Sequence, residues 1–145
     1  MQASEKCIAA IKSNEAFTAV AKHLPGDRWD VITGGYGDTL NVHVGQVFTE
    51  QQADRVLRAQ VASIEASINA AVHVPLTQGQ YDALVDFAYN EGAPSLMRST
   101  LLRKLNAGDY AGAVREFPSW DQANGRILAG LQARRALEQS WFEAA

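Results

Sequence analysis

The clearest pattern along the chain is a run of apolar residues at helical spacing. From Ala53 to Val72 they recur every three or four positions, on one face of a helix (Ala53, Leu57, Val61, Ile64, Ile68 and Val72). Thr49 and Gln52 form a capping box that predicts where this helix begins, and Pro75 lies beyond its predicted end. The pattern therefore predicts one long amphipathic helix.

Further helical patterns lie on both sides of the long helix. Thr77 and Gln80 repeat the capping box, and Gly92 stops the apolar stripe that follows them. Near the start of the chain, Ser4 can cap a helix that runs to about Glu15. Three more helices are predicted later in the chain, over 99–105, 109–117 and 127 to about 142.

The pattern changes between residues 28 and 47, where four glycines separate short β-branched or alternating stretches. The stretches at 31–33 and at Leu40, Val42 and Val44 predict a small antiparallel sheet with tight turns. The predicted fold class is therefore α+β and mainly α. We expect one domain over 1–145, with a small β lobe at about 16–48 joined by the long helix to a larger helical lobe. The helical lobe takes in about 73–145 and the N-terminal helix, and a cleft between the lobes is the natural place for a ligand.

Length and composition fit one soluble domain and exclude several classes of protein. The chain has 145 residues, 47% of them hydrophobic, and a single cysteine, so a framework of intramolecular disulfides is excluded. No apolar run approaches the roughly 20 residues that span a bilayer, and the first residues lack the layout of a signal peptide. The net charge of -3 argues against nucleic acid as a partner. We expect no stable membrane insertion.

Basic residues are concentrated late in the chain. Seven Arg or Lys residues stand against three acidic residues between 98 and 135. Such a stretch indicates either a mildly basic surface that meets an anionic polymer or, more simply, the solvated face of helices.

Two kinds of carboxyl group stand out near the start of the chain. Glu15 ends an amphipathic helix, whereas Asp27 and Asp30 lie in a polar turn beside Arg28. Glycoside hydrolysis uses two carboxyl groups in contrasting environments, one that donates a proton and one that activates water or attacks the sugar. Acidic residues at helix ends and in turns more commonly act as caps, so this pattern alone does not decide the function.

Other candidate chemistry is weaker. The three histidines are scattered and have no ligand spacing, so no metal site is expected. Cys7 lies among apolar residues, which predicts an inert thiol packed on the core. We expect Trp120 and Trp141 to anchor the fold, and Trp29 to lie at the edge of the cleft, where it can stack on a sugar ring.

Four segments in order resemble one known family. Residues 33–39 (TGGYGDT) are similar to the T-I-G-Y-G-H-T strand and turn of the phage-type lysozymes, the muramidase family of the phage T4 and phage P22 endolysins (glycoside hydrolase family 24). Residues 4–15 resemble its opening helix with the catalytic Glu, 74–93 its central helices, and 99–135 its C-terminal lobe. The resemblance covers nearly the whole chain.

The resemblance implies a set of site residues. Glu15 would be the general acid, Asp27 would activate the attacking water, and Thr33 would position that water. Asp27 and Thr33 have the family's separation, with five residues between them. Trp29 and Tyr36 are the expected substrate-binding residues. The family needs no metal or organic cofactor and usually inverts the anomeric centre.

The chain departs from the family pattern around this site. The segment between Glu15 and Asp27 is three residues longer than in the family. Four positions carry other residues than the customary ones: Ala16 for Gly, Lys22 for an aromatic residue, Gly34 for Ile and Asp38 for His. Asp30, and after it Asp38, remain alternatives for the second carboxylate.

The resemblance implies an endolysin that cuts the β-1,4 bond between N-acetylmuramic acid and N-acetylglucosamine in the glycan strands of peptidoglycan. We expect a monomer that stays in the host cytoplasm until a separate membrane pore releases it to the cell wall. Two alternatives remain: a glycan-binding or protein-interaction module that has lost turnover, and an antibacterial muramidase effector delivered by a specialised apparatus.

Overall fold

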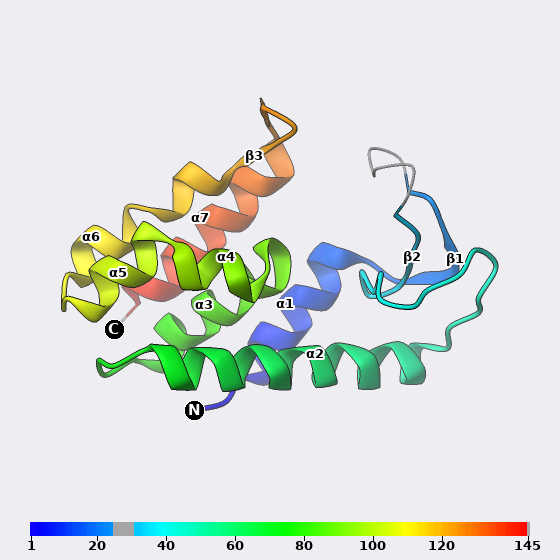
Figure 1. Ribbon diagram of the computed structural model, residues 1–145, viewed down its shortest axis with the longest axis horizontal. Helices are drawn as coiled ribbons and strands as arrows, with labels where there is room; N and C mark the ends of the chain where they lie inside the picture. Colours follow the sequence, from blue (N-terminus) through cyan, green and yellow to red (C-terminus); the bar gives the residue numbers. More distant parts are fainter. Residues whose placement is uncertain (25–30, 145) are drawn as a thin grey trace. The chain divides into compact units, whose positions relative to one another are not determined.

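The computed structural model describes residues 1–24 and 31–144. Its main helices are α1 (Glu5–Glu15), α2 (Glu50–Ala71), α3 (Gln78–Glu91), α4 (Ala93–Arg98), α5 (Thr100–Asn106), α6 (Tyr110–Val114) and α7 (Ala129–Glu143), with a 3-10 turn η1 at Phe117–Trp120. The strands are β1 (Thr18–Lys22), β2 (Thr33–Gly35), β3 (Gln122–Ala123) and β4 (Arg126–Ile127). They pair as two small antiparallel sheets, β1 with β2 and β3 with β4 (Figure 1). The predicted fold class, α+β and mainly α, is confirmed.

The chain divides into two compact units. Residues Ile8–Gln60 form one, here called the β unit, and Met1–Cys7 together with Val61–Ala145 form the other, the helical unit. The boundaries fall within α1 and α2, so each of these helices contributes residues to both units.

The β unit is built around a small apolar cluster. Its buried members are Ala21, Val42 and Phe48, with Phe17 and Ile32 packed against them. Backbone hydrogen bonds from Ala21 to Gln46 and from Phe48 to Ala19 tie the segment before α2 to β1. This cluster holds the β1–β2 ribbon in place.

The strands of the β unit differ from the prediction. The segment with Leu40, Val42 and Val44 is not a strand, and Leu40 and Val44 are 75% and 63% exposed. The partner of β2 is instead β1, which the sequence analysis did not predict. Only Ala21 of β1 is buried, so this strand lacks the alternation of apolar and polar residues that marks a half-buried strand.

The long helix α2 confirms the prediction closely. Thr49 and Gln52 form the capping box, with the Gln52 amide donating to the Thr49 hydroxyl at 3.1 Å. Four members of the predicted stripe are buried: Ala53, Leu57, Val61 and Ile68. The second capping box is also present at Thr77 in front of α3, and Gly92 ends that helix at a φ of 93°.

The first four residues dock on α2 and α3 within the helical unit. The Ser4 hydroxyl and amide donate to the two oxygens of Asp82 at 2.5 and 3.0 Å. The Met1 carbonyl accepts hydrogen bonds from Asn69 of α2 and Tyr81 of α3. The Ser4 hydroxyl also accepts from the Cys7 amide, so this docking and the cap of α1 share one side chain. Asp82 therefore fixes the start of α1.

The C-terminal part of the helical unit contains a hairpin that was not predicted. β3 and β4 are joined at Asn124 and Gly125, both at positive φ, which is the geometry of a tight hairpin turn. Ile127 belongs to this hairpin, so α7 begins at Ala129 instead of at Ile127. α7 packs on α3 so closely that a Cβ added at Gly79 would overlap the Trp141 carbonyl oxygen. None of the helices in the described part of the chain is long and apolar enough to cross a bilayer.

Candidate active site

Glu15 is the last residue of α1 and is half-buried. The helix stops there because Ala16 adopts a φ of 56° while its amide still donates to the Lys12 carbonyl at 3.0 Å. Left-handed backbone at a helix end is normally taken by glycine, since a Cβ there costs about 1 kcal/mol. Ala16, where the family has glycine, therefore adopts a backbone angle that favours glycine, at some cost in strain.

The turn between Thr33 and Asp38 forms the second part of the site. Gly34 and Asp38 exchange two backbone hydrogen bonds of 2.9 Å, and Gly35 and Gly37 adopt φ angles of 56° and 77°. Such angles strongly favour glycine. We call residues 34–38 the glycine turn.

Glu15 packs directly against the glycine turn. A Cβ built on Gly37 would lie 2.7 Å from Oε2 of Glu15 and 3.3 Å from its carboxyl carbon. The missing side chain of Gly37 therefore makes the space in which the Glu15 carboxyl group sits. This contact joins the end of α1 to the hairpin motif on which the family resemblance rests.

Two of the departures from the family pattern have a local explanation. A Cβ at Gly34 would overlap the buried Phe48 ring, so a side chain as large as Ile has no room at this position. Asp38 is 8% exposed, and its Oδ1 accepts hydrogen bonds from the Leu40 amide at 3.1 Å and from Gln60 Nε2 at 3.4 Å. Asp38 therefore closes the turn through its buried Oδ1, which weighs against it as the second carboxylate.

The structure describes two of the remaining predicted site residues, Thr33 and Tyr36. Thr33 is buried on β2 opposite Lys22, and Tyr36 is half-buried in the glycine turn, with its ring centroid 5.5 Å from that of Phe17. Asp27, Asp30 and Trp29 lie outside the described residues. The structure thus brings Glu15 to the turn that carries Tyr36, and the choice of second carboxylate stays a prediction.

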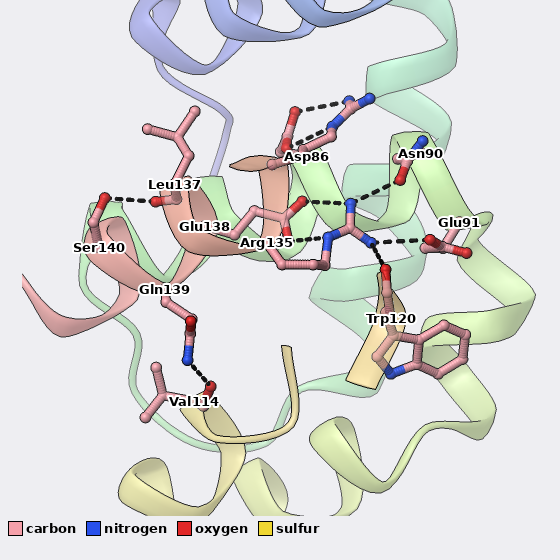
Figure 2. Close-up of polar contacts among 11 residues, drawn as sticks. Asp86, Asn90, Glu91, Val114, Trp120, Arg135, Leu137, Glu138, Gln139 and Ser140 are labelled. Carbon is pink, nitrogen blue, oxygen red and sulfur yellow. Dashed lines mark hydrogen bonds and ion pairs between the residues drawn. The ribbon is translucent and has the colours of Figure 1, made fainter. Parts of the chain in front are cut away.

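The helical unit contains a buried ionic network that the sequence analysis missed. Arg134 makes two hydrogen bonds to Asp86, at 2.9 and 3.0 Å. Arg135, 1% exposed, donates to Glu138, Glu91, Asn90 and the Trp120 carbonyl, as Figure 2 shows. The expectation that the whole basic stretch lies on a surface is wrong for Arg134 and Arg135. Two features of the sequence could have indicated their burial. Both arginines lie one helical turn from Glu138, and their neighbours in the sequence include apolar residues.

The carboxyl group of Glu138 is fully buried inside this network. Its Oε2 lies 2.9 Å from Nε of Arg135, within ion-pair distance but without the alignment of a hydrogen bond. Burial raises the pKa of Glu138 well above its ordinary value, the neighbouring Asp86 raises it further, and Arg135 opposes both. Glu138 therefore holds its proton to higher pH than an exposed glutamate does.

Other expectations concern residues outside the site. Cys7 is buried with its Sγ 3.5 Å from the Asp82 carbonyl oxygen, and burial, followed by the nearby carboxylates, raises the pKa of its thiol. The prediction that Cys7 packs in the core is confirmed. Trp141 is buried and Trp120 packs edge-on against Phe87, as expected for residues that anchor the fold. Over residues 1–24 and 31–144, no three His, Cys, Asp or Glu side chains gather in a way that suits a metal ion.

Comparisons with known proteins show the family of this chain. Residues 12–138 match the family model described as phage lysozyme. The endolysin of Acyrthosiphon pisum secondary endosymbiont phage 1 is 43% identical over 149 residues, which cover 100% of both chains. The endolysin of Bacillus phage B103 is 39% identical over 98% of this chain, which spans 54% of that longer protein. Among solved structures, the muramidase domain of SpmX from Asticaccaulis excentricus has a TM-score of 0.88 and 35% identity, with 99% of each chain covered.

The fold and the relatives are those of a lysozyme-type glycoside hydrolase. The chain belongs to the phage lysozyme family. The resemblance deduced from the sequence is thereby confirmed.

Proposed function

We propose that this protein is an endolysin that hydrolyses the β-1,4 bond between N-acetylmuramic acid and N-acetylglucosamine in peptidoglycan. The observation that carries the proposal is the Glu15 carboxyl group at the end of α1, seated against Gly37 in the glycine turn of a phage lysozyme chain. The relatives named as endolysins and the solved muramidase domain support the same substrate class.

In the proposed mechanism, Glu15 donates its proton to the oxygen of the leaving sugar. Asp27 accepts a proton from a water molecule that attacks the anomeric carbon on the opposite face, and Thr33 holds that water. The carboxylate of Asp27 also stabilises the positive charge that develops on the sugar. An inverting reaction of this kind needs room for water between the two carboxyl groups, typically about 6.5–9.5 Å. Tyr36 and Trp29 are proposed to contact the sugar rings, and no cofactor takes part.

The first prediction is that Glu15→Gln abolishes turnover while glycan binding persists. Glutamine keeps the shape of the side chain but has no proton to transfer, so the rate should fall by about 10²-fold or more. The measurement is the loss of turbidity of purified Gram-negative peptidoglycan. Borohydride reduction of the products should identify N-acetylmuramic acid at the new reducing ends.

The control for this variant is Glu50→Gln, which changes an exposed glutamate at the start of α2 in the same unit. It should lyse peptidoglycan like the wild type. Lysis by Glu15→Gln at the wild-type rate would overturn the assignment of the acid. Binding without turnover by the wild type would favour the alternative of a glycan-binding module, for which the strained Ala16 and the longer segment after Glu15 are the observations.

The second prediction separates the candidates for the other carboxylate. Asp27→Asn should reduce lysis by about 10²-fold or more, because it removes the base that activates water, whereas Asp30→Asn should have a small effect. The two rates are compared in the same turbidity assay. The opposite order would show that Asp30 is the base. The anomeric form of the first product, observed by NMR, tests inversion.

The proposed place of action is the host cell wall, which the protein reaches as a monomer after a separate pore opens the membrane. Several relatives carry the name SAR-endolysin, among them one from Bacteriophage PS119 that is 34% identical over 75% of this chain. Lysis of host cells that express this chain with and without a pore-forming protein tests the route.

A further inference from the structure

Lys12 joins three segments of the β unit. It lies on the last turn of α1, and its Nζ atom is 2.5 Å from Oδ1 of Asp54 on α2. The same ammonium group lies 5.5 Å from the centroid of the Tyr36 ring in the glycine turn, within the range of a cation–π contact. One charged group therefore contacts α2 and the glycine turn from α1.

Two of these segments, α1 and the glycine turn, hold the Glu15 carboxyl group, and the third, α2, packs against the glycine turn. Glu15 follows Lys12 by three residues on α1. The carboxyl group sits against Gly37, and Gly35 packs on α2, where a Cβ added at Gly35 would lie 3.2 Å from Cβ of Ala53. Tyr36 lies between these two glycines, so its contact with the ammonium group fixes the turn where the turn meets Glu15.

We propose that Lys12, through its ion pair with Asp54 and its contact with the Tyr36 ring, is a positioning residue for the Glu15 carboxyl group. It sets the distance between the end of α1 and the glycine turn, and so holds Glu15 where it can reach the glycosidic oxygen. This inference rests on the proposed function and adds to it a residue outside the reacting groups. A misplacement of about 1 Å at a reacting group can cost up to about 10²-fold in rate.

The Lys12–Asp54 pair is partly exposed, so an effect of Lys12 on catalysis can be distinguished from an effect on stability. Both side chains of the Lys12–Asp54 pair are 30% exposed, and ion pairs this accessible contribute little to the stability of a fold. The hydrogen bond from Lys12, helped by Arg58, lowers the pKa of Asp54, so the pair stays charged under the conditions of a lysis assay. Arg58 also binds Asp54 at 3.0 Å, from within α2. Arg55, an exposed cation next to Asp54 on the same helix, is therefore the control for loss of a positive charge from α2.

The experiment measures kcat, KM and Tm on soluble peptidoglycan glycan fragments of defined length. Lys12→Met should lower kcat about tenfold with KM within about twofold of the wild-type value, and Tm should change little. Lys12→Arg should restore most of kcat, because a guanidinium can make both contacts. Asp54→Asn should resemble Lys12→Met, and the double variant should lose no more than either single variant, as expected for two groups in one interaction. Arg55→Met should keep the wild-type kcat.

The inference fails if Lys12→Met keeps the wild-type kcat, if Arg55→Met loses as much kcat as Lys12→Met, or if the whole effect is on KM. Asp54→Asn breaks the same ion pair with Lys12 unchanged, so it gives the answer if Lys12→Met does not fold. The proposed function is judged separately by the wild type and Glu15→Gln. Turnover that depends on Glu15 but not on Lys12 overturns the positioning role alone, whereas a wild type without turnover overturns both.

Discussion

At the scale of single residues, the candidate site depends on a position that has no side chain, Gly37. Gly37 has a φ of 77°, and the space beside its α-carbon holds the carboxyl group of Glu15. Gly45 has a similar φ of 85° in the same unit, but a Cβ there would meet nothing within 4 Å. The two glycines therefore share the backbone requirement and differ only in their contact with Glu15.

This difference gives the third prediction. Gly37→Ala and Gly45→Ala should each lose about 1 kcal/mol of stability, because both place a Cβ at a left-handed backbone position. Gly37→Ala should also lower kcat about tenfold or more, since the new methyl group displaces the Glu15 carboxyl group. Denaturant unfolding and the lysis assay together measure both effects. Equal lysis rates in the two variants would mean that the contact with Gly37 does not position Glu15.

At the scale of elements, the packing of α7 on α3 also depends on a glycine. Gly79 lies in the first turn of α3, where an added Cβ would overlap the backbone oxygen of Trp141 on α7. Backbone atoms in a packed helix cannot move aside as a flexible side chain does. Gly130, in the first turn of α7, has open space beside its α-carbon.

The fourth prediction follows from this pair of helical glycines. Gly79→Ala should lower the free energy of unfolding by about 1–3 kcal/mol through overpacking. Gly130→Ala should raise it by up to about 1 kcal/mol, because alanine favours helix over glycine and meets no neighbour. Urea unfolding followed by circular dichroism measures both. A Gly79→Ala protein as stable as Gly130→Ala would show that α3 and α7 pack less tightly than the structure describes.

At the scale of the whole molecule, the buried network of Asp86, Arg134, Arg135 and Glu138 couples folding to pH. The folded state raises the pKa of Glu138 above its value in the unfolded chain, first through burial and then through Asp86. Above the ordinary pKa of a glutamate, the unfolded state therefore binds fewer protons than the folded state. The contribution of Glu138 to stability therefore falls as pH rises through this range, with a limiting slope of about 1.4 kcal/mol per pH unit for one proton.

The fifth prediction is that Glu138→Gln removes this part of the pH dependence. Glutamine imitates the protonated carboxyl group, so the variant should gain stability relative to the wild type between pH 5 and pH 8. Denaturant unfolding at the two pH values measures the gain, and Glu143→Gln, at an exposed glutamate of the same helix, is the control. If Glu138 is instead ionised as the partner of Arg135, Glu138→Gln will destabilise the protein at both pH values.

Much of the helical architecture was determined by the sequence itself. The stripe of α2 and the capping boxes at Thr49 and Thr77 are local signals, since helix hydrogen bonds and caps join residues only three or four positions apart. The order and spacing of the four segments at 4–15, 33–39, 74–93 and 99–135 were likewise sufficient to indicate the family. Neither the prediction of these helices nor that of the family required knowledge of contacts between residues far apart in the chain.

Tertiary structure decided the features that depend on residues far apart in the chain. β1 pairs with β2 and with the segment before α2 although its own sequence has no strand alternation. Arg134 and Arg135 are buried because Asp86 and Glu91 neutralise them and Glu138 accepts a hydrogen bond from Arg135, whereas charge along the chain suggested a surface. The space for Glu15 exists because Gly37 folds back onto the end of α1. Pairing, burial of charge and close approach are set by partners that local sequence does not specify, so only the folded chain shows them.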